Sequence, residues 1–265
     1  MPSVDPARLA REIDRMLEQT PDPSSRARGA ADLLERYAER ARRKPGRPED
    51  TLHTPRHVIT ALARSLTAET SDPDEGLALA SALWAIPLRE TRLLAADLLG
   101  VWGGVEVADW AEERAAETAD LRILEKVARH GLAAWRNGDR GEAFRRAGGW
   151  LTAPSTRVRE LGLLLLLSIV EAGESDDLRR VINLLGASPE TGSGPERKTF
   201  ARLLISLVRR SPREAARFLL DGVRRGNPAV SQIARQALPL LPARQQQTLE
   251  DALAHGEPSG IMPTS

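Results

Sequence analysis

The sequence predicts an all-α protein built from many short helices. Two observations favour this class. First, polar residues followed by proline recur along the chain, at Asp22-Pro23, Thr54-Pro55, Asp72-Pro73, Ser211-Pro212 and Asn227-Pro228. The polar side chain accepts hydrogen bonds from the N–H groups of a first helical turn, and proline fits the first helical position because no donor is needed there. Second, the segments between these signals carry apolar residues at helical spacing, and none has a convincing strand pattern.

In the first half of the chain, three of these signals begin the second, third and fourth helices. Gly103-Gly104 marks the end of the fifth helix, because glycine is common just past a helix C-terminus. Basic residues close the second helix, where they suit the negative end of its dipole: Arg40, Arg42, Arg43, Lys44 and Arg47. The helices expected here span residues 6–19, 23–43, 55–68, 73–84, 88–101, 105–117 and 120–136.

In the second half, Gly148-Gly149 ends one helix, and Ser211-Pro212 and Asn227-Pro228 begin two others. The helix over 155–171 is apolar on nearly every face, which predicts burial on several sides. The helices expected here span residues 140–150, 155–171, 175–186, 196–210, 212–224, 228–238 and 243–253.

Short loops favour antiparallel neighbours, and many helices paired in this way indicate an α-solenoid of HEAT-like (armadillo-type) helical repeats. The helix-start signals recur along the chain, whereas the amino-acid sequences of the expected repeats resemble one another only weakly. Aromatic residues make up only 3% of the chain, which fits tetratricopeptide repeats badly. We expect a single HEAT-like α-solenoid domain over 1–255 and a disordered tail over 256–265, with a globular helical bundle as the alternative.

Composition excludes several classes of function. The chain has no cysteine, so disulfides, thiolate zinc sites and cysteine nucleophiles are excluded. Its N-terminal residues lack an apolar signal core, and its longest apolar run, 161–170, is half of what a membrane span needs. His53 and His57 are four residues apart, but a helix starts between them and no third ligand is evident. We therefore expect a cytoplasmic monomer with no membrane association, no metal and no cofactor.

Charge is segregated along the chain, although the net charge is only +1. Residues 69–126 hold 13 acids and five bases, whereas residues 196–225 hold nine bases and three acids. Segregated positive charge is typical of a phosphate-binding surface. A genomic preference for arginine is the alternative explanation.

Two stretches carry a family pattern. The stretch from Tyr37 to Trp102 has a Thr-Pro helix start followed by a basic residue, then a Leu-Trp pair, a proline turn, an Arg-Glu pair and an Ala-Asp-Leu-Leu run. The stretch from Trp150 to Leu219 has a tryptophan at a helix end, a basic helix, Lys198 and a Ser-Pro start. This order resembles the bacterial DNA alkylation repair glycosylases, a family built of HEAT-like repeats. The first set is Thr54, Pro55, Arg56, Leu83, Trp84, Pro87, Arg89, Glu90, Ala96, Asp97, Leu98 and Leu99.

The resemblance implies duplex DNA as partner and N3- or N7-alkylated purines as targets, excised by a DNA-3-methyladenine/7-methylguanine glycosylase. Counted back from Trp150 without a gap, the family's essential acid falls on Glu125. Other positions diverge from the family: Leu121 and Arg202 stand where it has tryptophans, and its paired arginines fall on Arg159 and Glu160. Catalysis therefore stays open at this point.

Glu125 is the candidate catalytic residue. An alkylated purine is a good leaving group because it already carries positive charge, and a carboxylate beside the sugar stabilises the oxocarbenium-like transition state. The alternative is an ordinary helix-face ion pair between Glu125 and Arg129 at i+4.

The candidate DNA-binding residues are Arg157, Arg159, Lys198, Arg202 and Arg209. Lys198, Arg202 and Arg209 share roughly one helical face, so they could follow one DNA backbone if a concave surface collects them. A solvated outer face is the alternative. The rival function is a non-catalytic HEAT-like scaffold that binds a protein partner, which the acidic segment 69–126 favours.

The five tryptophans suggest packing more than base stacking. Trp84, Trp102, Trp135 and Trp150 fall near helix ends, where a large ring fills the gap between helices. Trp110 follows an acid in an acidic helix, and we expect it to be exposed.

Overall fold

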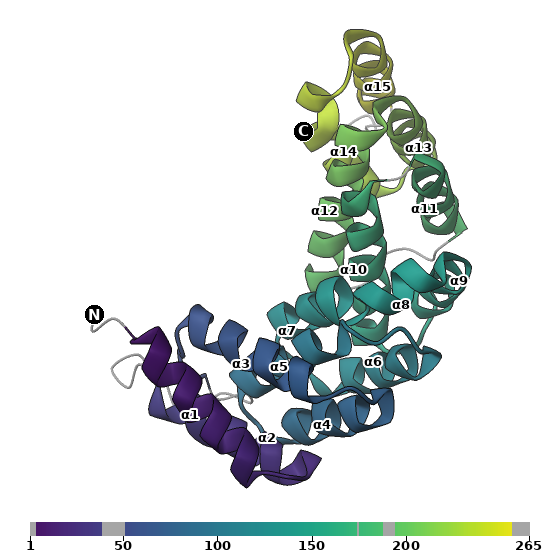
Figure 1. Ribbon diagram of the computed structural model, residues 1–265. Helices are drawn as coiled ribbons and strands as arrows, with labels where there is room; N and C mark the ends of the chain where they lie inside the picture. The colour runs from purple at the N-terminus through teal and green to yellow at the C-terminus, as the bar shows by residue number, and fades with distance from the viewer. Residues whose placement is uncertain (1–3, 39–50, 174, 188–193, 256–265) are drawn as a thin grey trace, which may run out of the picture. The chain divides into compact units, whose positions relative to one another are not determined.

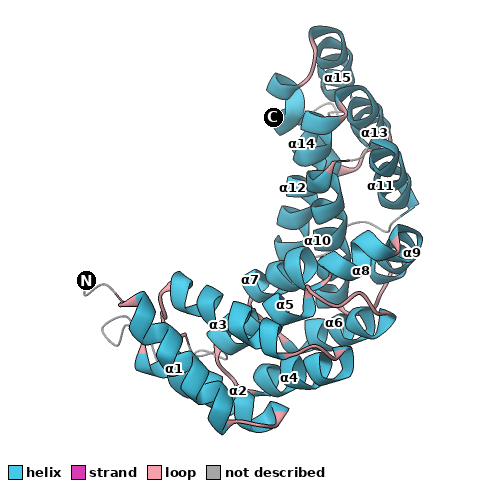
Figure 2. Ribbon diagram, viewed as in Figure 1, coloured by secondary structure: helices cyan, strands magenta, loops and turns pink. Residues whose placement is uncertain are grey.

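The computed structural model describes residues 4–38, 51–173, 175–187 and 194–255. These residues form helices and connecting loops with no strand among them, which confirms the all-α class (Figure 2). The chain divides into two compact units, Met1–Arg140 and Gly141–Ser265. One domain over 1–255 stays a prediction. The basic residues from Arg40 to Arg47 and the expected tail over 256–265 lie outside the described residues.

In the first unit, alternate helices pack side by side. The helix α1 contacts α3, α3 contacts α5, and α5 contacts α7, while α2 contacts α4 and α6 contacts α8 (Figure 1). The elements are α1 (Pro6–Gln19), α2 (Pro23–Arg36), α3 (Arg56–Glu69), α4 (Pro73–Ala85), α5 (Arg89–Leu99), α6 (Val105–Glu117), α7 (Leu121–Lys126), the π-helix η2 (Val127–Gly131) and α8 (Ala133–Gly138).

The second unit repeats this arrangement in two layers of helices. One layer contains α10, α12 and α14, and the other contains α11, α13 and α15 (Figure 1). Contacts of α13 with α12 and α14, and of α10 with α11, join the two layers. The elements are α9 (Arg140–Leu151), α10 (Thr156–Ala172), α11 (Ser175–Ala187), α12 (Gly194–Arg210), α13 (Pro212–Arg224), α14 (Pro228–Ala237), the 3₁₀-helix η3 (Leu238–Leu240) and α15 (Ala243–His255).

The polar-proline signals mark real helix starts, and three of the five form the expected cap. Asp22, Asp72 and Asn227 each accept a backbone N–H of the first turn. The expectation was wrong for two side chains. The Thr54 hydroxyl donates instead to the buried Leu34 carbonyl at 2.9 Å, so Pro55 takes the N-cap position. The Ser211 hydroxyl donates to the Glu214 carboxylate at 3.0 Å.

The helix expected over 120–136 is interrupted. Residues Val127–Gly131 form one π-helical turn, which the Leu132 N–H closes by donating to the Val127 carbonyl at 2.9 Å. Close packing accompanies this turn, because a Cβ on Gly100 would stand only 2.4 Å from the His130 carbonyl oxygen. Helical periodicity carries no signal for one extra residue in a turn, so the sequence predicts a continuous helix here.

A buried acid holds the loop before α3. The side chain of Glu90 on α5 accepts the backbone N–H groups of Leu52 at 3.1 Å and His53 at 2.9 Å. His53 has φ 56°, a left-handed conformation that costs a non-glycine residue energy. Glu90, the acid of the Arg-Glu pair noted in the sequence, therefore fixes the loop before α3.

Helix α10 forms the middle of the second unit. Every residue from Glu160 to Val170 is buried, which confirms the expectation from its leucine-rich pattern. The helix ends at Gly173, whose φ of 88° favours glycine and whose N–H donates to the Ile169 carbonyl.

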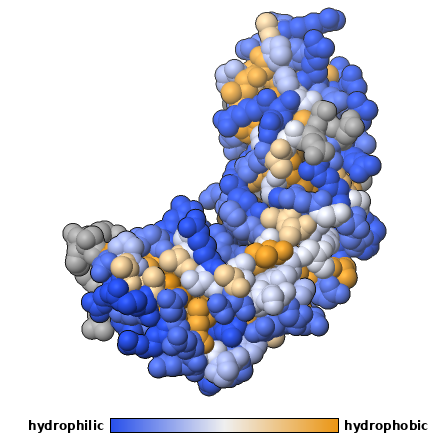
Figure 3. Space-filling model, viewed as in Figure 1, coloured by the Kyte–Doolittle hydropathy of each residue, from blue (hydrophilic) through white to orange (hydrophobic). Residues whose placement is uncertain are grey.

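The outer surface is mostly polar. The most exposed large apolar side chains of the described residues are Val101, Val105 and Leu240. The face in Figure 3 is largely hydrophilic, with scattered apolar patches. None of the described helices is both long and apolar enough to cross a membrane.

Candidate nucleic-acid interface and catalytic carboxylate

Glu125 lies in the last turn of α7, with its side chain 29% exposed. Asp120 caps this helix by accepting the Arg122 N–H at 2.8 Å, and Ile123 and Leu124 bury its inner face. The Arg129 guanidinium lies 3.6 Å from the Glu125 carboxylate. The expected i, i+4 pair is therefore present, and the carboxylate also has access to solvent.

Charged groups of both signs lie near the junction of α7 and η2, which follows Glu125 in the chain. The Lys126 ammonium pairs with Asp97 of α5 at 2.5 Å. Burial and the positive charge of Lys126 lower the pKa of His130 below its usual value, while Asp97 opposes the shift and Arg129 and Arg56 add to it. His130 is therefore biased toward its neutral form.

Arg157 and Arg159, both predicted to bind DNA, make hydrogen bonds to acceptors within the protein. Arg157 donates to the Glu160 carboxylate at 2.7 Å, and that carboxylate is fully buried. Arg159 donates to Glu196 at 2.9 and 3.2 Å, and also to the carbonyls of Ala153 and Pro154. The hydrogen bond to Glu196 raises the pKa of Arg159 further above its ordinary value.

Glu196 is not among the predicted site residues, although the sequence holds a signal for it. It occupies the apolar stripe of α12, in step with Phe200, Leu203 and Leu207, and it is only 3% exposed. An acid at a core position needs a partner, and Arg159 on the neighbouring helix supplies it.

Lys198, Arg202 and Arg209 lie together on the exposed face of α12. They follow one another at four and seven residues, and residues on the opposite side of the helix are buried. We call these three residues the α12 basic stripe. Glu196, the single acid of α12, is buried beneath that surface. The exposed part of α12 therefore carries positive charge alone.

The other arginines of the basic segment do not join this stripe. Arg210 donates to the Glu171 carbonyl at 2.5 Å. Arg213 and Arg217 are exposed on α13, which belongs to the other layer of the unit (Figure 1). The structure thus divides the basic segment between two surfaces.

The aromatic rings are used for packing. All five tryptophans are buried, and the expectation that Trp110 is exposed was wrong, since it is only 5% accessible. Its ring meets that of Trp84 edge to face at 5.0 Å, and its indole N–H donates to Ser81 at 2.9 Å. The indole N–H of Trp84 on α4 donates to Glu117 of α6 at 3.0 Å, so the polar atoms of both rings have partners although the rings are buried.

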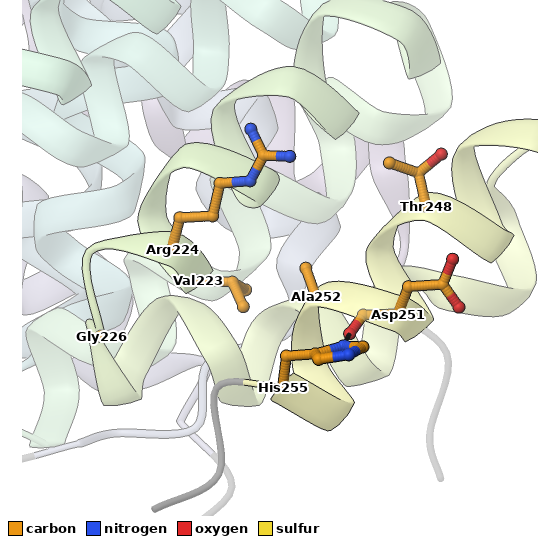
Figure 4. A pocket seen from close by; sticks show the side chains of 7 residues that line it. All are labelled: Val223, Arg224, Gly226, Thr248, Asp251, Ala252 and His255. Carbon is orange, nitrogen blue, oxygen red and sulfur yellow. Dashed lines mark hydrogen bonds between the residues drawn. The ribbon is translucent and has the colours of Figure 1, made fainter.

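The second unit has two neighbouring pockets between α13 and α15. One, of about 550 Å³, is lined by Arg224 at the end of α13 and by Asp251 and His255 of α15 (Figure 4). The other, of about 390 Å³, is lined by Arg213, Arg217 and Arg244. The first mixes charges, whereas the second carries no acid. Within the described part of the chain, no group of three His, Asp or Glu side chains is placed to hold a metal ion.

The described residues thus form an all-helical protein with paired, layered helices, and α12 carries the α12 basic stripe on its exposed face. A family model described as DNA alkylation repair enzyme matches residues 48–250, so the chain belongs to this family. Its membership connects the protein to DNA repair. No curated protein matches the chain.

Proposed function

We propose that the protein is a HEAT-like α-solenoid that binds duplex DNA and excises or recognises N3- or N7-alkylated purines. The ladder of contacts between alternate helices supports the repeat interpretation, because stacked helix pairs touch their neighbours in this order. Family membership supports DNA as the partner.

The α12 basic stripe is the observation that carries the binding proposal. At 1.5 Å per residue, Lys198 and Arg202 lie about 6 Å apart along the helix, and Arg209 lies about 10 Å further. Each strand of duplex DNA presents one phosphate per about 3.4 Å of axis, so this length follows roughly five phosphates. Phosphate contacts also fit the burial of the aromatic rings, because they need no stacking surface.

Arg159 supports the stripe indirectly in this proposal. Its guanidinium pairs with Glu196, the single acid of α12, so this acid does not offset the positive charge of the stripe. Arg157, with its side chain 29% exposed, adds a phosphate contact when its pair with Glu160 opens.

Glu125 is the proposed catalytic residue. A partly exposed carboxylate can stabilise the cationic sugar that forms as an alkylated purine leaves. The Arg129 guanidinium lies 3.6 Å from this carboxylate.

Binding is tested with a duplex of mixed sequence at low salt, measured by fluorescence anisotropy. The expected result is binding that weakens steeply as salt is raised. No binding at low salt would reject the proposal, and binding of a protein partner through the same stripe would favour the scaffold function.

Excision is tested by release of 7-methylguanine and 3-methyladenine from methylated duplex DNA. Glu125→Gln should abolish release, and Glu125→Asp should keep part of it because the charge stays. The exposed acid Glu113 on α6 gives a matched control, since Glu113→Gln removes the same charge elsewhere. Unchanged release in Glu125→Gln removes this residue from the mechanism.

A further inference from the structure

Three arginines line the pocket of about 390 Å³ between α13 and α15. Arg213 and Arg217 come from successive turns of α13, and Arg244 comes from the first turn of α15. The pocket belongs to the layer that does not contain the α12 basic stripe. We propose that it binds an organic phosphomonoester, independently of duplex DNA.

Within the described residues, none of the three guanidinium groups makes an ion pair, although Glu214 and Asp221 line an adjoining pocket together with Arg217. Two of the nearby acids have other partners. Glu214 pairs with Arg179 at 3.5 Å and accepts the Ser211 hydroxyl, while Glu250 accepts the Gln246 amide at 3.0 Å. Three like charges around one pocket repel one another, and a bound dianion relieves that repulsion.

The position of Arg244 adds to this imbalance. The N-terminus of a helix carries partial positive charge, so a cation in the first turn is unfavourable and an anion is favourable. The first turn of α15 has no acid. An anion in the pocket would therefore interact with the helix end as well as with the arginines.

Part of the pocket lining is apolar; we call this part the floor, and it indicates the rest of the ligand. Ala216 and Leu249 are buried, and Leu220 is half-buried beside them. The volume lies within the range of small-molecule sites, which combine an apolar lining with a few placed polar groups. A flat or apolar body attached to the anion would cover this floor.

The charge number favours a phosphomonoester over a carboxylate. A phosphate monoester carries close to two negative charges and three terminal oxygens, and guanidinium groups bind such oxygens in pairs. A carboxylate offers one charge and two oxygens, which would leave at least one of the three arginines unmatched.

The test uses the full chain and isothermal titration calorimetry with phenyl phosphate, inorganic phosphate and benzyl alcohol. We expect phenyl phosphate to bind more tightly than inorganic phosphate, and benzyl alcohol not to bind. The variant R213Q/R217Q/R244Q should lose at least tenfold in affinity for phenyl phosphate. Deoxyadenosine monophosphate and glucose 6-phosphate then distinguish a nucleotide from a sugar phosphate as the source of the phosphate group.

Two further variants keep the outcome clear. K198Q/R202Q/R209Q removes the same charge from the α12 basic stripe and should bind phenyl phosphate normally, whether or not the protein binds DNA. Leu220→Gln should weaken phenyl phosphate but leave inorganic phosphate unchanged. Equal binding by wild type and R213Q/R217Q/R244Q, or no binding by wild type, would overturn the proposal. A loss of duplex binding in R213Q/R217Q/R244Q would also overturn it, because the pocket would then serve DNA.

Discussion

Neutralising the α12 basic stripe should change the salt dependence of DNA binding by a calculable amount. Each neutralised phosphate contributes about −0.9 to the slope of log affinity against log salt, so three contacts contribute about −2.7. Between 50 mM and 200 mM salt, these three contacts alone weaken binding by about 40-fold. The variant K198Q/R202Q/R209Q should therefore have a slope shallower than that of the wild type by about 2.7.

The assay is anisotropy of a labelled duplex titrated at several salt concentrations, with circular dichroism to verify folding. These side chains are exposed, so folding should be unaffected. The matched control R213Q/R217Q/R244Q removes the same charge from the other layer and should keep the wild-type slope. An unchanged slope in K198Q/R202Q/R209Q, or an equal change in the control, would refute the assignment.

Three further predictions concern stability. Glu160→Gln should lower the free energy of unfolding by about 2 kcal/mol, because the buried side chain that accepts from Arg157 loses its negative charge. The partly exposed Arg157 keeps its contact with water, which limits the cost. Urea unfolding that shows no change in this free energy contradicts the prediction. Gly76→Ala should lower the free energy of unfolding by about 1–2 kcal/mol, since the new Cβ would stand 2.5 Å from the Trp102 ring. Gly149→Ala should raise it by up to about 1 kcal/mol, because a Cβ there meets nothing within 4 Å. Equal shifts of the two variants in thermal unfolding would refute the packing argument. Because the pKa of His130 is lowered in the folded protein, the unfolded chain binds this proton first as the pH falls through 6.5, and the free energy of unfolding decreases from there to the folded pKa. His130→Asn should remove this contribution to the pH dependence of stability. Urea midpoints of the two proteins at about pH 7.5 and 5.5 measure the difference.

Much of the helical architecture could be predicted from local chemistry. The starts at Asp22, Asp72 and Asn227 follow from a polar acceptor and a following proline, and both are short-range effects. Thr54 and Ser211 carry the same pattern, yet their hydroxyl groups donate to other acceptors. The acceptor for Thr54 lies 20 residues away on α2, and local sequence cannot reveal such a partner.

The candidate site was less predictable, because charge and burial depend on neighbours. Helical spacing placed Lys198, Arg202 and Arg209 on one face, and the described structure has them exposed there. Arg159 was predicted to bind DNA with them, but its role depends on Glu196, 37 residues later on a different helix. Whether Glu125 acts in catalysis stays a prediction.

The turn at Val127–Gly131 makes the chain sensitive to length at this place. A helix continued past one deleted residue would present every later side chain rotated by about 100° and drawn back by about 1.5 Å. Trp135 and Arg136, now buried, would swing toward water. Deletion of one residue here would therefore rotate the rest of the helix about its axis, whereas the same deletion in a surface loop would only shorten the loop.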